Sequence, residues 1–225
     1  MVFGEIVEPS TRALLDDDDY PEYTPPTIEW TGDQQCLSRA ESLIFVETRR
    51  IGEIFHKFIL QDLKPVCSTK NNIYIYEKSN HFIIVHNESY YGANDLATGE
   101  VIKSIENYIV KAKQIITITS RALSAYEGEL DREAVECLFK CLSTNKLTFD
   151  CDRLKSPNFI TGLGGDVLSY CIYKKLQCSS FVLYHKNFDV DTLSSKPVLE
   201  LAEKLGLSPS QHYLKTELPK NNLYM

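Results

Sequence analysis

The sequence has no long hydrophobic run and little glycine or proline. Its 225 residues include 10 glycines and 9 prolines, and 43% are hydrophobic, which excludes collagen-like and wholly disordered chains. No apolar stretch approaches the roughly 18 residues of a membrane-spanning helix. A chain of this length and composition can fill a hydrophobic core without disulfides or metals, so we expect an ordinary globular protein.

Positive charge is also scarce. The chain carries 24 basic and 31 acidic residues, which gives a net charge of −7, and no run of Lys or Arg exceeds two residues. A nucleic-acid backbone is therefore an unfavourable partner. The start, Met1 to Glu5, lacks the basic and apolar segments of a secretory signal, and the 7 cysteines lie mostly in apolar segments, as buried thiols do. We expect a cytoplasmic protein, with the nucleus as a second compartment.

The composition changes along the chain. Residues 1–36 contain the acidic run Asp16-Asp17-Asp18-Asp19 and several prolines, so they predict an extended N-terminal segment. Residues 37–208 show regular hydrophobic patterns and predict a single α/β domain. Residues 209–225 have little periodicity and predict a flexible C-terminal tail.

Strand-like and helix-like patterns alternate within the predicted domain. β-Branched and aromatic runs predict strands at residues 43–46, 73–76, 81–86, 115–119 and 180–184. Apolar residues at spacings of three and four predict helices at residues 51–59, 101–110, 133–142, 165–175 and 198–205. Strands that alternate with helices favour a three-layer α/β/α sandwich around a central sheet, mostly parallel or mixed.

A glycine-rich stretch, Thr161 to Asp166, begins the predicted helix at 165–175. Such turns can hold phosphate with their backbone N–H groups. Here no Lys-Ser/Thr pair follows the glycines, and Asp166 brings a negative charge to the place where an anion would bind. The sequence favours a capped helix start over a nucleotide site.

Catalytic signatures are weak. Cys137 and Cys141 stand four residues apart on a predicted helix without a second ligand pair at zinc spacing, so buried hydrophobic side chains explain them better. His86, beside Asn87 and Glu88 at a strand end, is the one histidine that we consider as a catalytic base. A small cytosolic α/β hydrolase or phosphorylase-like enzyme, using His86, Glu88 or a cysteine, remains as an alternative. It predicts a concave pocket with converging polar groups.

The chain ends in Leu223-Tyr224-Met225 after the polar residues Lys220 to Asn222. A terminal carboxylate offers charge-assisted hydrogen bonds, Leu223 offers apolar surface, and Tyr224 supplies a flat ring with a polar tip. This combination suits a peptide tail that docks in a pocket of a partner protein.

The same ending resembles the hydrophobic-tyrosine-any residue (HbYX) motif with which proteasome activators and assembly chaperones enter pockets between α subunits of the 20S core particle. Two further stretches, Phe3 to Val7 before the acidic run and Asp166 to Cys171, are similar to stretches of proteasome assembly chaperones. The order of the predicted elements also agrees, with strands at 115–121 and 180–184 before the last helix and tail. The chain thus resembles the proteasome assembly chaperone family as a divergent member.

This resemblance implies a nucleoside-phosphorylase-like, three-layer fold and a protein that is not an enzyme and needs no cofactor or metal. It implies a heterodimer with proteasome assembly chaperone 2 that binds the α ring of the assembling 20S proteasome. Leu223, Tyr224 and Met225 would dock in a pocket between two 20S proteasome α subunits.

Overall fold

The computed structural model describes residues 27–209 except 71, 87–96, 132, 146–148, 187–189 and 191. The acidic run Asp16 to Asp19, Glu88 and the terminal residues Leu223, Tyr224 and Met225 lie outside these described residues.

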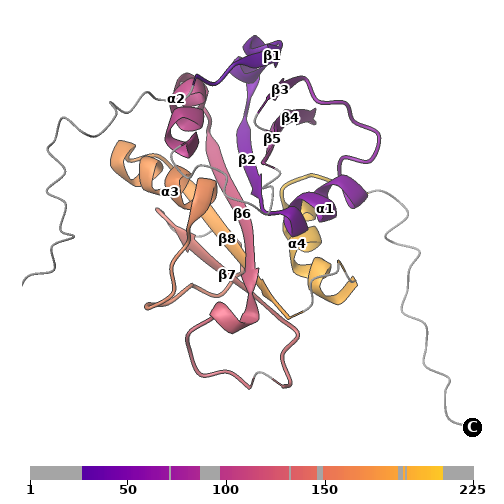
Figure 1. Ribbon diagram of the computed structural model, residues 1–225, viewed down its shortest axis with the longest axis vertical. Coiled ribbons are helices and arrows are strands. Elements are labelled where there is room, and N and C mark those ends of the chain that lie inside the picture. Colours follow the sequence, from indigo (N-terminus) through magenta and orange to yellow (C-terminus); the bar gives the residue numbers. More distant parts are fainter. Residues whose placement is uncertain are drawn as a thin grey trace, which may run out of the picture.

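An eight-stranded mixed sheet forms the centre of the molecule, in the order β1-β3-β4-β5-β2-β6-β8-β7 (Figure 1). The strands are β1 (Trp30–Gly32), β2 (Ser42–Glu47), β3 (Cys67–Thr69), β4 (Ile73–Lys78), β5 (His81–His86), β6 (Gln114–Ala122), β7 (Cys137–Ser143) and β8 (Cys178–His185). The four strands β5, β2, β6 and β8 are parallel, whereas β1, β3, β4 and β7 join the sheet through antiparallel pairs.

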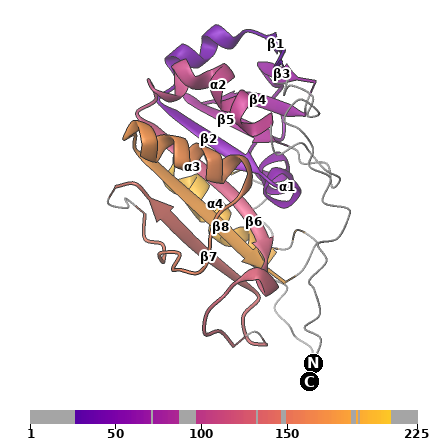
Figure 2. The same cartoon turned by 60° about the vertical axis from the view of Figure 1, so that its left-hand side comes forward.

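Helices cover both faces of this sheet. The helices are α1 (Arg49–Phe58), α2 (Ala97–Ile109), α3 (Gly162–Lys174) and α4 (Thr192–Lys204), with short 3-10 helices η2 (Gln34–Arg39) and η3 (Leu123–Ala125). α2 and α3 pack on one face and α1 and α4 on the other, as Figure 2 shows with α3 in front of the strands and α4 behind them. The predicted three-layer α/β/α sandwich is confirmed.

The position of β2 in the centre of the sheet explains why its sequence is continuously apolar. Leu43 and Phe45 pack beneath α2 and α3, whereas Ile44 and Val46 pack beneath α1 and α4. All four side chains are fully buried, and each contributes roughly 1.5–3 kcal/mol through removal from water. A strand covered on both faces needs no polar alternation.

The predicted helix at residues 133–142 is wrong, because β7 occupies most of that range. Phe139 and Cys141 face the core beneath α4, while Leu138 and Leu142 face the opposite side. A four-residue spacing keeps Cys137 and Cys141 on one face of a strand as well as of a helix, so the pattern did not distinguish the two. Antiparallel pairing with β8 determines the outcome.

The predicted domain start at residue 37 is too late. β1 pairs with β3 in the sheet, and η2 begins at Gln34. The indole Nε1 of Trp30 also donates a hydrogen bond of 3.0 Å to Ser104 Oγ on α2. Part of the segment assigned to residues 1–36 therefore belongs to the folded sheet.

The predicted end of the last helix is confirmed. Gly206 follows α4 with a φ of +78°, in the left-handed region that favours glycine, and the N–H of Leu207 donates to the Ala202 carbonyl at 2.8 Å. This turn stops the helix and places Leu207, which is fully buried, against the core.

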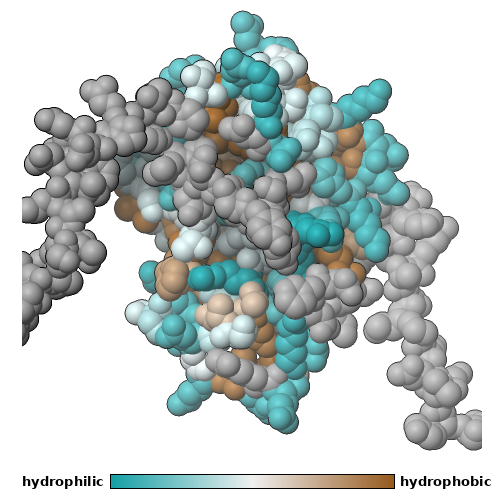
Figure 3. All heavy atoms as spheres, viewed as in Figure 1, coloured by the Kyte–Doolittle hydropathy of each residue, from teal (hydrophilic) through white to brown (hydrophobic). Residues whose placement is uncertain are grey.

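The surface mixes polar and apolar side chains. Hydrophilic residues form most of the coloured rim of the face in Figure 3, and hydrophobic residues lie in patches between them. Among the described residues, none of the helices has the length and apolar character required to cross a membrane.

We expect Phe181→Ala to lower the free energy of unfolding by about 4 kcal/mol. Phe181 is fully buried, with ring centroids 5.5 Å from Phe139 and 5.9 Å from Phe149, so truncation leaves a cavity in the core. Urea denaturation measures this loss. Phe159→Ala, at a side chain that is 55% exposed, is the matched control and should cost less than about 1 kcal/mol. Equal losses would contradict the packing described here.

Candidate functional site

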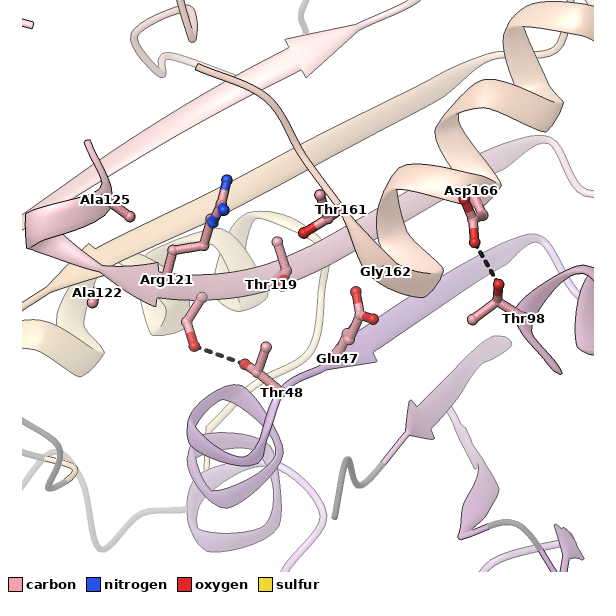
Figure 4. Close-up of a pocket in the computed structure, with 11 residues that line it drawn as sticks. Glu47, Thr48, Thr98, Thr119, Arg121, Ala122, Ala125, Thr161, Gly162 and Asp166 are labelled. Carbon is pink, nitrogen blue, oxygen red and sulfur yellow. Dashed lines mark hydrogen bonds between the residues drawn. The ribbon is translucent and has the colours of Figure 1, made fainter. Parts of the chain in front are cut away.

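A crevice of about 590 Å³ opens at the carboxyl ends of β2 and β6 (Figure 4). β2 lies between β5 and β6, and the chain crosses from one side of β2 to the other after β5. In open α/β sheets, ligands bind outside the strand ends at such a reversal of strand order. The topology therefore makes this crevice the candidate functional site.

The lining comes from strand ends and from the start of a helix. It comprises Glu47 and Thr48 after β2, Thr98 of α2, Thr119, Ser120, Arg121, Ala122 and Ala125 along and after β6, and Thr161, Gly162 and Asp166 at the start of α3.

Glu47 joins β2 to α3. Its side chain is directed toward the first turn of α3, where its two carboxylate oxygens accept hydrogen bonds from the Leu163 N–H at 2.6 Å and the Gly164 N–H at 2.9 Å. Glu47 is only 1% exposed. A negative charge at a helix N-terminus is favourable because the free N–H groups carry partial positive charge. The carboxylate thus fills the position where a phosphate would bind.

The glycines at this helix start are required by close packing. A Cβ on Gly162, whose φ is +76°, would lie 2.2 Å from Glu47 Oε1, and a Cβ on Gly165 would lie 2.7 Å from the Ile160 carbonyl oxygen. The predicted helix is confirmed, although it begins at Gly162 and not at Gly165, and the anion at its N–H groups is Glu47. Asp166 instead accepts a hydrogen bond of 2.5 Å from Thr98 Oγ1.

Thr48 adopts a strained backbone beside Glu47. Its φ of 74° and ψ of 145° are unfavourable for a β-branched residue and cost about 1–3 kcal/mol. Thr48 Oγ1 and Ser120 Oγ are joined by a hydrogen bond of 2.7 Å, which fixes the end of β2 against β6. Strain of this kind concentrates at sites where geometry matters for function.

Arg121 provides the positive charge of the crevice. Its guanidinium donates a hydrogen bond of 2.9 Å to the Phe159 carbonyl and lies 4.7 Å from the centroid of the Phe159 ring. Each charged side chain of the described lining therefore contacts another part of the chain. This arrangement is suited to holding the crevice in one shape.

His86, the predicted catalytic base, does not belong to the described lining of the crevice. It ends β5 and pairs in register with Glu47, and its Nδ1 is buried without a hydrogen-bond partner among the described residues. Burial lowers the pKa of His86. The imidazole is therefore neutral at neutral pH.

The cysteines also lie away from the described lining. Cys137 and Cys141 are on β7, and burial raises the pKa of the Cys141 thiol. Within the described residues, no group of three or more His, Cys, Asp or Glu side chains is arranged to hold a metal. The enzymatic alternative predicted a pocket, which exists, but neither His86 nor a cysteine belongs to its described lining, and Glu88 lies outside the described residues.

Sequence inspection missed Glu47, Thr48 and Arg121. The available signal was a carboxylate at the end of an apolar strand, directly before a helix. The partners of Glu47 lie 116 and 117 residues further along the chain, so its role becomes visible only in the folded structure.

Comparisons with known proteins place the fold among solved structures. No protein-family model and no curated protein matches the sequence. The crystal structure of Pyrococcus furiosus PbaA, an archaeal homolog of proteasome-assembly chaperone, is similar with a TM-score of 0.62 and 16% identity, over 84% of this chain and 87% of PbaA. PbaB of the same organism, an archaeal proteasome activator, gives a TM-score of 0.57 and 12% identity, over 81% of this chain and 90% of PbaB. A Thermoplasma acidophilum protein with unknown function gives 0.55 and 14%, over 75% of this chain and 78% of that one. At these identities the similarity establishes a shared fold.

We expect Glu47→Gln to lower the free energy of unfolding by about 2 kcal/mol, because an amide can accept only one of the two hydrogen bonds and removes the charge at the helix start. Urea denaturation at neutral pH measures the change. Glu53→Gln is the control, since Glu53 forms an exposed ion pair with Arg49 on α1 and should cost less than about 0.5 kcal/mol. A Glu47 variant as stable as the control would contradict this role.

The lowered pKa of His86 predicts a pH dependence. Between the folded pKa and the ordinary value of 6.5, the unfolded chain binds more protons than the folded chain, so stability falls as the pH decreases through this range. We expect His86→Gln to lose less stability than wild type between pH 7.5 and pH 5.5 in urea titrations. A remaining decrease is expected, because burial also lowers the pKa of His56 and His81. Identical pH profiles would rule out a burial cost for protonated His86.

Proposed function

We propose that this chain is a divergent homologue of proteasome assembly chaperone 1 and acts as a chaperone in 20S proteasome assembly. One observation carries the proposal: the chain ends in the HbYX-like sequence Leu223-Tyr224-Met225. The fold supports it, because the same architecture occurs in PbaA, an archaeal homolog of proteasome-assembly chaperone, and in PbaB, an archaeal proteasome activator.

The chain would divide its binding between the folded body and a tethered tail. Leu223 and Tyr224 would enter a pocket between two α subunits, and the carboxylate of Met225 would accept charge-assisted hydrogen bonds there. A tether raises the local concentration of the terminal residues once the body is bound, so two weak contacts combine into a tighter one.

The last described residues are anchored to the folded body. Lys78 Nζ donates hydrogen bonds to the Ile59 carbonyl at 2.7 Å and to the Ser208 carbonyl at 3.1 Å. The neighbouring Leu207 is fully buried. From this anchored start, an extended chain adds about 3.3 Å per residue, so Met225 can reach roughly 50 Å from the body. That reach allows the body and the tail to bind separate places on one ring.

The proposal includes a heterodimer with proteasome assembly chaperone 2 that binds the outer face of the α ring in the cytoplasm or nucleus. We infer that the body works by binding and not by catalysis. In support, Glu47, Arg121 and Asp166 in the crevice are all engaged with other parts of the chain. A shared fold alone does not transfer catalytic activity.

Removal of Leu223 to Met225 should weaken binding to isolated 20S α rings by at least about tenfold, because the tethered contact is lost. Tyr224→Ala should cause most of this loss, and one extra residue after Met225 should also weaken binding by moving the carboxylate. Surface plasmon resonance with immobilised α rings measures the affinities.

Asn221→Ala is the matched control for these tail variants, because it changes the tail before the terminal motif. It should bind like wild type, and thermal unfolding should be the same for all variants. An unchanged α-ring affinity after the deletion would refute the tail mechanism.

A further inference from the structure

Three pairs of cysteines bring their thiols into contact. All 7 cysteines of the chain are described by the structure as free thiols. In each pair a hydrogen bond joins the two side chains, and the pairs are Cys36 with Cys67, Cys141 with Cys151, and Cys171 with Cys178. Each pair joins two separate segments of the fold, so oxidation of any pair would cross-link those segments.

Exposure distinguishes one pair from the other two. Cys151 is partly exposed, although its partner Cys141 is fully buried. The four cysteines of the other two pairs are at most 5% exposed. Thiol–disulfide exchange begins with direct contact between the sulfur and the oxidant. Cys151 is therefore the thiol of these pairs that an oxidant in solution reaches first.

Backbone contacts hold Cys141 and Cys151 side by side. Cys141 lies on β7, the last strand in the order of the sheet (Figure 2), and its N–H donates to the Asp152 carbonyl at 2.9 Å while its carbonyl accepts from the Leu154 N–H at 2.7 Å. Cys141 Sγ lies 3.3 Å from the Cys151 carbonyl oxygen, and Cys151 Sγ lies 3.7 Å from that of Phe139. Because the fold already keeps the two thiols in contact, closing a disulfide needs little further ordering of the chain.

Positive side chains lie close to this pair. The charges of Lys140 and Arg153 both act on the Cys141 thiol. The nearby carboxylate of Asp152 is held in an ion pair with Lys140 at 2.7 Å, whereas Arg153 and Lys155 are exposed and have no ion pair within the described part of the chain. Oxidised glutathione is a peptide disulfide that carries several carboxylates, so these cations favour its approach.

The environment of the two thiols determines how fast they react. Burial raises the pKa of both, to about 12 for Cys151, which is also raised by its contact with Cys141. The thiolate is the attacking form, so the first attack is slow at neutral pH, and its rate should increase about tenfold per pH unit between pH 7 and pH 9. A thiol of high pKa is also a poor leaving group, so the disulfide should be reduced slowly once it has formed.

We propose that Cys141 and Cys151 form a disulfide when the protein meets a small disulfide oxidant such as oxidised glutathione. This inference goes beyond the proposed function and does not depend on it. The Cys151 thiolate attacks one sulfur of the oxidant, which breaks the S–S bond of the oxidant, forms a mixed disulfide and releases one glutathione thiolate.

The second step closes the protein disulfide. The Cys141 thiolate attacks Cys151 Sγ and displaces the second glutathione. The two released glutathione thiolates take up the two protons that the cysteines lost. Two cysteine thiols are thus oxidised to one disulfide, and one molecule of oxidised glutathione is reduced to two molecules of the thiol form.

The disulfide would fasten residues 151–154 to the outer edge of β7. Edge strands present backbone groups that can pair with another chain, and this segment covers the edge at Cys141 through two hydrogen bonds. A covalent link would keep that cover in place when the hydrogen bonds open.

The test incubates the full chain with oxidised glutathione and identifies the linked peptides by mass spectrometry. We expect a link between Cys141 and Cys151, with free thiols at the four buried cysteines of the other pairs. Cys141→Ser should stop the reaction at the mixed disulfide, so one glutathione remains on Cys151. Cys171→Ser is the matched control, because it breaks a buried pair, and it should form the same link at the wild-type rate.

Hydrogen exchange measures the consequence of the link. The Leu154 N–H, which bonds to the Cys141 carbonyl, should exchange at least about tenfold more slowly in the oxidised chain, because local opening of the segment is restricted. Cys151→Ser, treated in the same way, should show no change on oxidation.

The wild-type peptide map alone decides the outcome, so the test does not depend on the folding of any variant. A link that forms first within either buried pair would overturn the inference, since access would then not control the reaction. A link between Cys137 and Cys151 would overturn the choice of partner. A chain in which Cys141 and Cys151 both stay reduced at pH 9 would overturn the site altogether.

Discussion

The carboxylate of Glu47 is the constraint on which the helix layer of α2 and α3 depends. It is buried at the end of the central strand, where an unpaired charge would be strongly destabilising, and the first N–H groups of α3 are its partners. This contact fixes where α3 begins and requires glycine at position 162. Because α3 packs beside α2, the same contact also helps to position the layer that these two helices form.

Much of the fold was predictable because its signals are local. The apolar run of β2, the strands β4 and β5 and the amphipathic α1 each follow from neighbouring residues, and all are confirmed. β7 was not predictable, since its spacing suits either a strand or a helix until β8 pairs with it. The candidate site was even harder to predict from the sequence. Glu47 looks like an ordinary polar residue at a strand end, and its partners are more than a hundred residues away in the sequence.

The position of the crevice favours the binding of a small ligand. The contacts of its charged side chains favour a structural role, and we give these contacts more weight. A reversal of strand order is where α/β proteins usually bind small ligands, and strained Thr48 lies there. Yet the charged groups of the lining are each hydrogen-bonded to another part of the chain, as in a structural contact between elements. Under the proposed function, the contacts with partners lie outside this crevice. The contacts within the crevice are suited to keeping the strand ends and the start of α3 in one arrangement.

The strand order has a consequence for synthesis on the ribosome. β7 precedes β8 in the sequence but lies outside it in the sheet, and β8 is its strand partner. While residues 144–177 emerge from the ribosome, β7 lacks its strand partner, and its apolar side chains stay unpaired for seconds at usual rates of translation. During this interval the nascent chain exposes an unpaired apolar strand, which is a point at which misassembly can begin.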